Sequence, residues 1–311
     1  GKISRNFIDR AIRTQEGSKI VNNQLLSNIE KHSGSFSKGQ RAIAQFITHS
    51  YDKAAFMTAA RLGQTVGVSE STVVRFAVEV GFDGYPELQK AMQEMIRSRL
   101  TSVQRINVAQ EQIGAQDVLS SVLNADMDTI RATMEATSHD AFEAAVDAIV
   151  GTRRIYIVAA RSSAPVAAFL GYYFNLIFGH VTVVNAVSES EFFEKMFRVG
   201  AADTVIGFSF PRYSTSVAKA LRFARDKGAT VISVTDSRQS PLAPYATHLL
   251  LAQSSMISIV DSLVAPMSLV NALIAAVAAR KKADVSQAFE QLESIWDKYA
   301  VYEKVEEQPQ E

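Results

Sequence analysis

Three short segments of this chain combine hydroxyl side chains with an arginine, which are residue types that bind phosphate and carboxylate groups. They are Ala159–Pro165, Ser209–Ser216 and Thr235–Leu242, and each follows a short β-rich run. In open parallel sheets, ligands bind beyond the carboxyl ends of the strands, and the amides of a following helix attract anions. We therefore predict an anion site formed by Arg161, Ser162, Ser163, Ser209, Arg212, Tyr213, Ser214, Asp236 and Ser237.

A simpler interpretation exists for each segment taken alone. Ser162 or Ser163 and Ser214 or Ser216 can serve as helix N-caps, and Asp236 with Ser237 can form a turn. Three such segments at one edge of a sheet favour a binding site over three unrelated caps.

The segment Thr58–Gly81 has the pattern of two short helices joined by a tight turn. Gly67 can adopt the left-handed conformation that ends the first helix, and Ser69 can cap the second. This arrangement is the helix-turn-helix unit, whose second helix contacts base edges with its N-terminal half. A plain helical hairpin is the alternative. In the second helix the apolar side chains recur at the spacing of a buried face. The polar residues at its start are left facing outward, and we predict that they contact DNA: Ser69, Glu70, Ser71, Thr72 and Arg75.

The elements that must position these residues divide the chain in two. Residues 22–98 show helical periodicity throughout and predict an all-α domain after a flexible lead-in at 1–21. Residues 99–125 are predicted to be a linker, and 301–311 a disordered tail. Between them, residues 126–300 alternate helical stretches with β-rich runs, which indicates a parallel five-stranded sheet covered by helices. The runs are 154–160, 180–185, 204–209, 230–235 and 248–252.

Charge is distributed unevenly along this chain. The 311 residues carry 32 basic and 32 acidic side chains, which alone argues against a nucleic-acid partner. Residues 1–100, however, have 14 Lys and Arg against 9 Asp and Glu, a net of +5, and the rest has a net of −5. A basic module beside an acidic one fits DNA binding by the first domain.

Composition also limits the location of the protein and its chemistry. The absence of cysteine excludes a disulfide scaffold, a thiolate metal site and a Cys nucleophile. We expect a cytoplasmic protein with no membrane partner, since the N-terminus has no apolar signal core and the uncharged stretches 162–188 and 262–279 are interrupted by Pro, Asn and Ser. The two apolar helices expected at 164–178 and 263–279 are candidate subunit interfaces.

Both parts of the chain resemble one known family. G-V-S-x-S-T-V-V-R-F at Gly67–Phe76 and G-F-D-G-Y-P-E-L at Gly81–Leu88 resemble the N-terminal domain of RpiR-family bacterial transcription regulators. T-D-S-x-x-S-P-L-A at Thr235–Ala243 is similar to the sugar isomerase (SIS) domain that follows in that family. The resemblance implies that the chain binds double-stranded DNA through Ser69–Arg75. It also implies a small-molecule effector, a phosphosugar, held by Ser162, Ser163, Ser209, Ser214 and Ser237. Because a helix-turn-helix normally reads two half-sites, we expect a homodimer or homotetramer.

The chain departs from the family pattern at two ligand segments. Val217 stands where a threonine often occurs, and Ala159 or Ala160 replaces a common glycine. The two arginines, Arg161 and Arg212, still favour an anionic ligand.

Two other functions compete with a regulator. A phosphosugar isomerase needs a positioned base, for which Glu189, Glu191 and Glu194 are available after the second β-rich run. No histidine is paired with them in the pattern, and a solvated helix start explains all three, so we predict no enzymatic activity. The SIS domain can also serve as a dimerisation scaffold alone. We expect no cofactor and no metal, because glycine-rich nucleotide loops are absent and the histidines lack ligand spacing.

Overall fold

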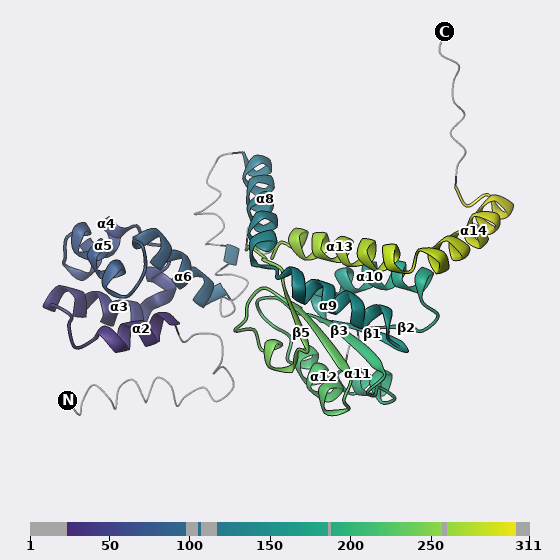
Figure 1. Ribbon diagram of the computed structural model, residues 1–311. Coiled ribbons are helices and arrows are strands. Elements are labelled where there is room, and N and C mark those ends of the chain that lie inside the picture. Colours follow the sequence, from purple (N-terminus) through teal and green to yellow (C-terminus); the bar gives the residue numbers. More distant parts are fainter. Residues whose placement is uncertain (1–23, 98–104, 107–116, 186–187, 257–259, 303–311) are drawn as a thin grey trace, which may run out of the picture.

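The computed structural model describes residues 24–97, 105–106, 117–185, 188–256 and 260–302. An all-helical domain comes first, and an α/β domain follows it (Figure 1). The helices of the first domain are α2 (Gln24–His32), α3 (Lys38–Ala54), α4 (Ala59–Val66), α5 (Glu70–Glu79) and α6 (Tyr85–Arg97).

Side-chain caps and an apolar core define the helical domain. Ser37 and Gln40 form a reciprocal capping box at the start of α3, and the Thr58 hydroxyl accepts the Arg61 N–H at the start of α4. The rings of Phe36 and Phe76 lie 5.3 Å apart at their centroids. Around them pack buried apolar side chains at helical spacing, including Ile43, Ile47, Leu62, Val73, Ala77 and Val80.

The α/β domain is built on one parallel sheet with strand order β2-β1-β3-β4-β5. Its strands are β1 (Arg154–Ala159), β2 (Val181–Val184), β3 (Asp203–Phe208), β4 (Thr230–Thr235) and β5 (His248–Leu251). Its helices are α8 (Val118–Ala136), α9 (His139–Val150), α10 (Ala164–Ile177), α11 (Glu189–Met196), α12 (Thr215–Asp226), α13 (Val264–Arg280) and α14 (Lys282–Tyr299), with short 3-10 turns η1 (Arg161–Ser163) and η2 (Ala243–Tyr245).

Helices cover both faces of this sheet. On one face α9, α10 and α13 enclose a core that includes Ile157, Phe174 and Leu273, and on the other α11 and α12 enclose one that includes Val158, Phe192 and Leu221. Coverage on both faces explains why β3 is buried at every position, from Asp203 to Phe208. The predicted fold class, a helix-turn-helix domain followed by a helix-covered parallel five-stranded sheet, is confirmed.

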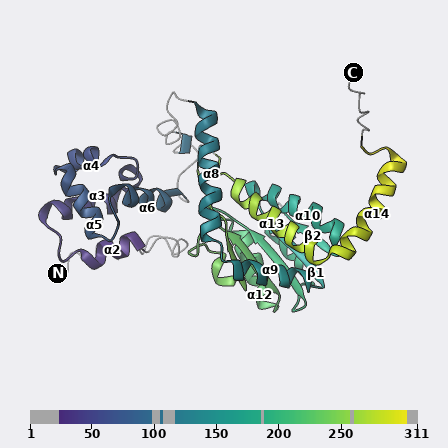
Figure 2. The same cartoon turned by 45° about the horizontal axis from the view of Figure 1, so that its top comes forward.

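Two helices lie at the margin of these layers, where α8 contacts α13 and α14 contacts α10. In both views α8 stands between the helical domain and the sheet, and α14 projects away from the body (Figures 1 and 2). α8 begins at Val118, inside the segment predicted as a linker, and α14 has no buried residue. Among the described residues, only α13 and α14 taken as a pair, bent by 99° at their junction, have the length and apolar composition of a membrane span; no single helix does.

The predicted lead-in at 1–21 lies outside the described residues, as do most of the predicted linker and tail. α13 contacts α8, α9 and α10, so much of this predicted interface helix lies inside the domain. Its Leu269, Val270, Leu273 and Val277 are buried.

Candidate functional site

The predicted DNA-contacting residues lie at the start of α5. Gly67 has φ +76°, the left-handed conformation that ends α4, and its N–H donates to the Gly63 carbonyl. The Ser69 hydroxyl accepts the Thr72 N–H at 3.3 Å and lies 2.9 Å from the hydroxyls of both Ser71 and Thr72. The Ser-x-Ser-Thr pattern therefore builds a cap that fixes where α5 begins.

The outward face of α5 carries the polar groups. Ser69, Glu70, Ser71 and Arg75 are exposed and Thr72 is half-buried. The Arg75 Nε donates to the Ser71 carbonyl at 3.3 Å, which holds the guanidinium along the first turns of α5. An exposed helix N-terminal half with a fork-shaped donor is the geometry by which such a helix contacts base edges in the major groove.

Sequence reasoning missed further surface residues beside this helix. A Cβ placed on Gly39 would lie 3.1 Å from Val68 Cγ1 and 3.5 Å from Thr72 Cγ2, so the start of α3 lies against the turn. Lys38, in the first turn of α3, is exposed there. Val74 and Val78 are also exposed on α5. Lys38 had no local signal, because only the tertiary packing of α3 places it near α5.

The predicted anion residues lie at the carboxyl ends of β1, β3 and β4, which are neighbours in the sheet. The Thr235 hydroxyl donates to the Ser209 carbonyl at 2.8 Å, and the Ser214 N–H donates to the Ser209 hydroxyl at 2.9 Å. The Tyr213 hydroxyl donates to the Asp236 carboxylate, also at 2.8 Å. The segments after β3 and β4 are therefore joined to each other at this edge.

Two of the predicted arginines have unusual backbone conformations. Arg161 has φ +54° and Arg212 has φ +64°, in the left-handed region that costs a non-glycine residue about 1–2 kcal/mol. Each lies just after a strand and before a helix, in the segments after β1 and β3. Strain of this kind collects at functional sites, and successive amides around a left-handed residue form an anion-binding concavity.

The remaining predicted anion residues differ in exposure. Ser214 caps α12, accepting the Val217 N–H at 3.4 Å, whereas Ser163 makes no capping hydrogen bond with its side chain. Ser209 is buried and supports the segment after β3 from within. At this edge Arg161, Ser162 and Arg212 are exposed; Tyr213, Ser214, Asp236 and Ser237 are half-buried; Ser163 and Ser209 are buried.

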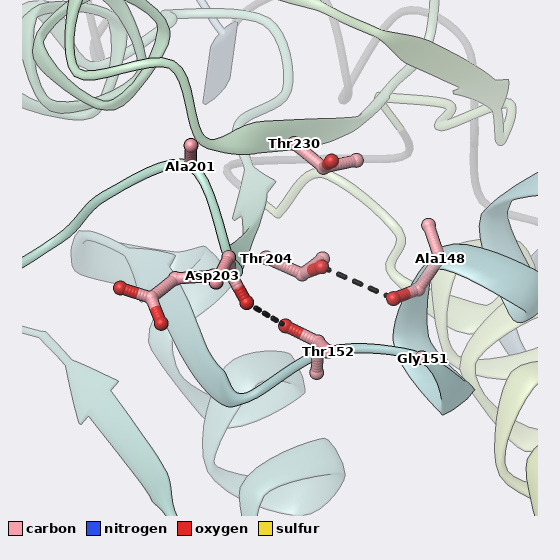
Figure 3. Close-up of a pocket in the computed structure, with 8 residues that line it drawn as sticks. Ala148, Gly151, Thr152, Ala201, Asp203, Thr204 and Thr230 are labelled. Atoms are coloured by element: carbon pink, nitrogen blue, oxygen red, sulfur yellow. Dashed lines mark hydrogen bonds between the residues drawn. The ribbon is translucent and has the colours of Figure 1, made fainter.

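A cavity of about 230 Å³ lies at the opposite edge, at the amino ends of β3 and β4 (Figure 3). Three threonines contribute to its lining, and two of their hydroxyls already donate to backbone carbonyls: Thr204 to Ala148 at 3.2 Å and Thr152 to Ala202 at 3.3 Å. These hydrogen bonds hold α9 and the loop before β3 together. The threonines of this cavity therefore have a structural role that requires no ligand.

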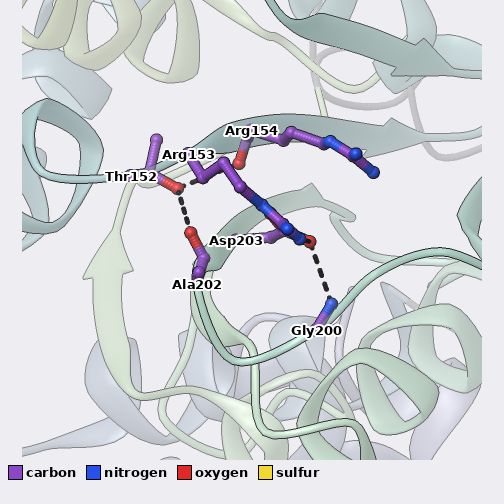
Figure 4. Close-up of polar contacts among 6 residues, drawn as sticks. All are labelled: Thr152, Arg153, Arg154, Gly200, Ala202 and Asp203. Carbon is purple, nitrogen blue, oxygen red and sulfur yellow. Dashed lines mark hydrogen bonds and ion pairs between the residues drawn. The ribbon is translucent and has the colours of Figure 1, made fainter.

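Asp203 anchors the same edge (Figure 4). Its side chain is fully buried and accepts from Arg153 Nε and Nη2, each at 3.0 Å, and from the Gly200 N–H at 2.9 Å. The hydrogen bonds and charge of Asp203 raise the pKa of the Arg153 guanidinium. This carboxylate is satisfied within the protein, which leaves the carboxyl edge as the candidate ligand site.

The glutamates considered for an isomerase lie on α11. The Ser188 hydroxyl accepts the Glu191 N–H at 3.3 Å and so caps this helix. The Glu191 carboxylate is 2.8 Å from Lys195 Nζ, one turn further along. These contacts fit the interpretation of a solvated helix start.

The fold is that of a helix-turn-helix transcription regulator with a second, α/β domain. The helix-turn-helix domain of the rpiR family matches residues 23–99, and the SIS domain matches residues 148–276. The chain belongs to the RpiR family of regulators, in which these two domains occur together.

Known proteins similar to this chain carry corresponding names. The HTH-type transcriptional regulator HexR of Pseudomonas aeruginosa is 24% identical over 72% of this chain and 76% of its own. The sugar isomerase domain of an RpiR transcription factor from Sphaerobacter thermophilus covers 58% of this chain and 99% of its own, with 29% identity and a TM-score of 0.55. The Vibrio vulnificus NanR protein, solved in complex with ManNAc-6P, covers 87% of this chain and 98% of its own, with 20% identity and a TM-score of 0.53.

Proposed function

We propose that this protein binds specific DNA through α5 and that a small anionic effector, a phosphosugar, modulates this binding from the SIS domain. The observation that carries the proposal is the pairing of an exposed, capped recognition helix with left-handed arginines at two neighbouring strand ends. The first is a DNA-contacting geometry and the second an anion-binding one.

On DNA, α5 would enter the major groove. Arg75 can donate two hydrogen bonds to the O6 and N7 atoms of a guanine, and the exposed Val74 methyls can contact a thymine methyl. Lys38 and the hydroxyls at Ser69 and Ser71 would contact phosphates, which position the protein without specifying sequence. The excess of basic residues in the first hundred residues supports this assignment.

The effector would bind at the carboxyl edge of the sheet. Arg161 and Arg212 would supply charge, and the hydroxyls of Ser162 and Ser237 would supply neutral donors. NanR, a protein of similar fold, was solved with the sugar phosphate ManNAc-6P, which supports a phosphosugar as the ligand class.

We infer that the SIS domain is not enzymatic. Sugar-phosphate isomerisation needs a base within hydrogen-bond reach of the substrate. The Glu191 carboxylate is instead engaged by Lys195, on a helix start that Ser188 caps. Turnover of a sugar phosphate by the purified protein, lost in Glu191→Gln, would restore the isomerase interpretation.

We further propose a cytoplasmic homodimer or homotetramer in which α8 contacts a second copy. Its outward face carries large apolar side chains at helical spacing, with Leu119 68% and Met134 71% exposed. Leu123, Met127 and Ile130 continue the same stripe. A stripe of this kind is typical of a helix that packs against another helix. A two-fold assembly would present two copies of α5 to DNA half-sites.

Two measurements on the full-length protein test this function. Fluorescence anisotropy with DNA selected from a random library should show specific binding that Arg75→Ala weakens about 5- to 150-fold, the loss of one base contact worth ~1–3 kcal/mol. A thermal-shift screen of sugar phosphates should find stabilisation that Arg161→Ala reduces, with DNA affinity unchanged in the absence of ligand. A wild-type protein that showed no specific DNA binding and no thermal shift with any sugar phosphate would refute the proposal.

A further inference from the structure

The segment that follows β5 contacts the candidate effector site, α8, the chain between the domains and the helical domain. This segment, residues 252–256 and 260–263 as described, is here called the post-β5 segment. We propose that the post-β5 segment and Arg105 couple the effector site to the DNA-binding domain. The inference rests on the proposed function and names the device that connects its two sites.

At the effector end, Gln253 holds the segment to the loop after β4. Its Nε2 donates to the Asp236 carbonyl at 3.2 Å, and the Asp236 carboxylate accepts the Tyr213 hydroxyl at 2.8 Å. The Gln253 N–H donates to the Thr133 hydroxyl of α8 at 2.8 Å. Two hydrogen bonds through Gln253 therefore connect Asp236 to α8.

At the DNA-binding end, the segment reaches the helical domain. The side chain of Met256 packs against the core of that domain. Met256 also forms an antiparallel bridge with Asp261, and beside it the Ser262 N–H donates to the Ser255 carbonyl at 2.8 Å. The two limbs of the segment are thus joined next to the domain contact.

Arg105 fastens this bridge to the chain that connects the domains. Its Nη1 lies 2.8 Å from the Asp261 carboxylate, and its side chain is only 2% exposed against 13% for Asp261. The Ser262 hydroxyl next along the chain donates to Asp126 of α8 at 2.5 Å. A buried ion pair is stable only with good geometry, so it favours one discrete arrangement over a range of intermediate ones.

These contacts give a physical path for the effector. An anion entering beside Arg212 would repel the Asp236 carboxylate and compete for the Tyr213 hydroxyl. Movement of Asp236 changes the acceptor of Gln253, and the segment transmits that change to the bridge that Arg105 and Met256 hold. An effector can act in this way only if these contacts have two arrangements and the effector binds better to one of them. DNA binding then changes the affinity for the effector by the same factor.

The first test measures DNA affinity of the full-length protein with and without ManNAc-6P. Wild type should show a change of about 5- to 150-fold. Gln253→Leu and Arg105→Gln should lose that change, yet keep their DNA affinity without the sugar phosphate and their thermal shift with it. Gln291→Leu on α14 and Arg131→Gln, which breaks an exposed ion pair on α8, are matched controls that should behave as wild type. A full response in both variants would overturn the proposal.

A second measurement keeps the test independent of the effector and of folding defects. Amide hydrogen exchange should become faster at Ser262 in Gln253→Leu, and faster at Gln253 in Arg105→Gln, because the two ends are coupled. Arg105→Lys, which keeps the charge, should show a smaller effect. Increased exchange confined to each altered end would overturn the coupling. A wild type that binds DNA without responding to any sugar phosphate would contradict the proposed function instead, and the exchange result would then decide the coupling alone.

Discussion

Gly63→Ala is expected to damage the helix-turn-helix by crowding its turn. A Cβ on Gly63 would lie 2.8 Å from the Val68 carbonyl oxygen, 3.3 Å from the Ser69 carbonyl carbon and 3.4 Å from the Glu70 nitrogen. All three are backbone atoms, so no side-chain rotation relieves the contact. The turn folds back on this residue because the Val68 N–H donates to the Gly63 carbonyl at 2.8 Å.

Two opposing effects set the magnitude. Alanine favours a helix over glycine by about 1 kcal/mol, whereas an added methyl group in a packed site costs about 1–3 kcal/mol. The contact with rigid backbone puts the cost at the upper end, so the helical domain should lose about 1–2 kcal/mol of unfolding free energy. For a domain of this size each kcal/mol lowers Tm by roughly 4–8 °C.

The assay is urea unfolding followed by far-UV circular dichroism, with amide hydrogen exchange reporting the helical and α/β domains separately. Only the helical transition should shift, and DNA affinity should fall because α5 is displaced from α4. Gly34→Ala is the control, since its Cβ would meet no atom within 4 Å. A Gly63→Ala protein as stable as wild type, with unchanged DNA affinity, would refute the reasoning about this turn.

Three further predictions concern the α/β domain. Asp203→Asn should lower its unfolding free energy by about 1–3 kcal/mol in urea titrations, because Arg153 loses a charged hydrogen-bond partner; an unchanged midpoint would contradict this. Burial lowers the pKa of His248, so stability is complete above its ordinary value of about 6.5 and falls as the pH drops below it, a dependence that His248→Phe should reduce. A Cβ on Gly171 would lie 2.3 Å from Val183 Cγ2, so Gly171→Ala should cost about 1–3 kcal/mol and Val183→Ala should rescue it in a double-mutant cycle.

Local patterns predicted much of the fold. Gly67 and Ser69 have physical roles that depend on their neighbours in sequence, and the structure confirms both the left-handed end of α4 and the cap of α5. The β-rich runs likewise correspond to the five strands within a residue or two at each end. Strands this short and this apolar are recognisable because both faces of the sheet are covered.

Features that depend on tertiary contacts were not predictable. The ion pair between Arg105 and Asp261 joins residues 156 positions apart, and neither residue has a local pattern that indicates the other. The left-handed backbone of Arg161 and Arg212 is also unexpected, because non-glycine residues rarely adopt it and the surrounding fold must impose it. Ser209 was predicted from its chemistry as a ligand contact, which stays a prediction; its burial depends on how the loop closes over it.

The most direct test of the central claim is an anisotropy titration of the full-length protein on DNA selected from a random library, with and without saturating sugar phosphate. The account predicts saturable, salt-sensitive binding whose Kd changes about 5- to 150-fold when the sugar phosphate is added. Binding that is absent at low salt, or a Kd that no sugar phosphate alters, would contradict it.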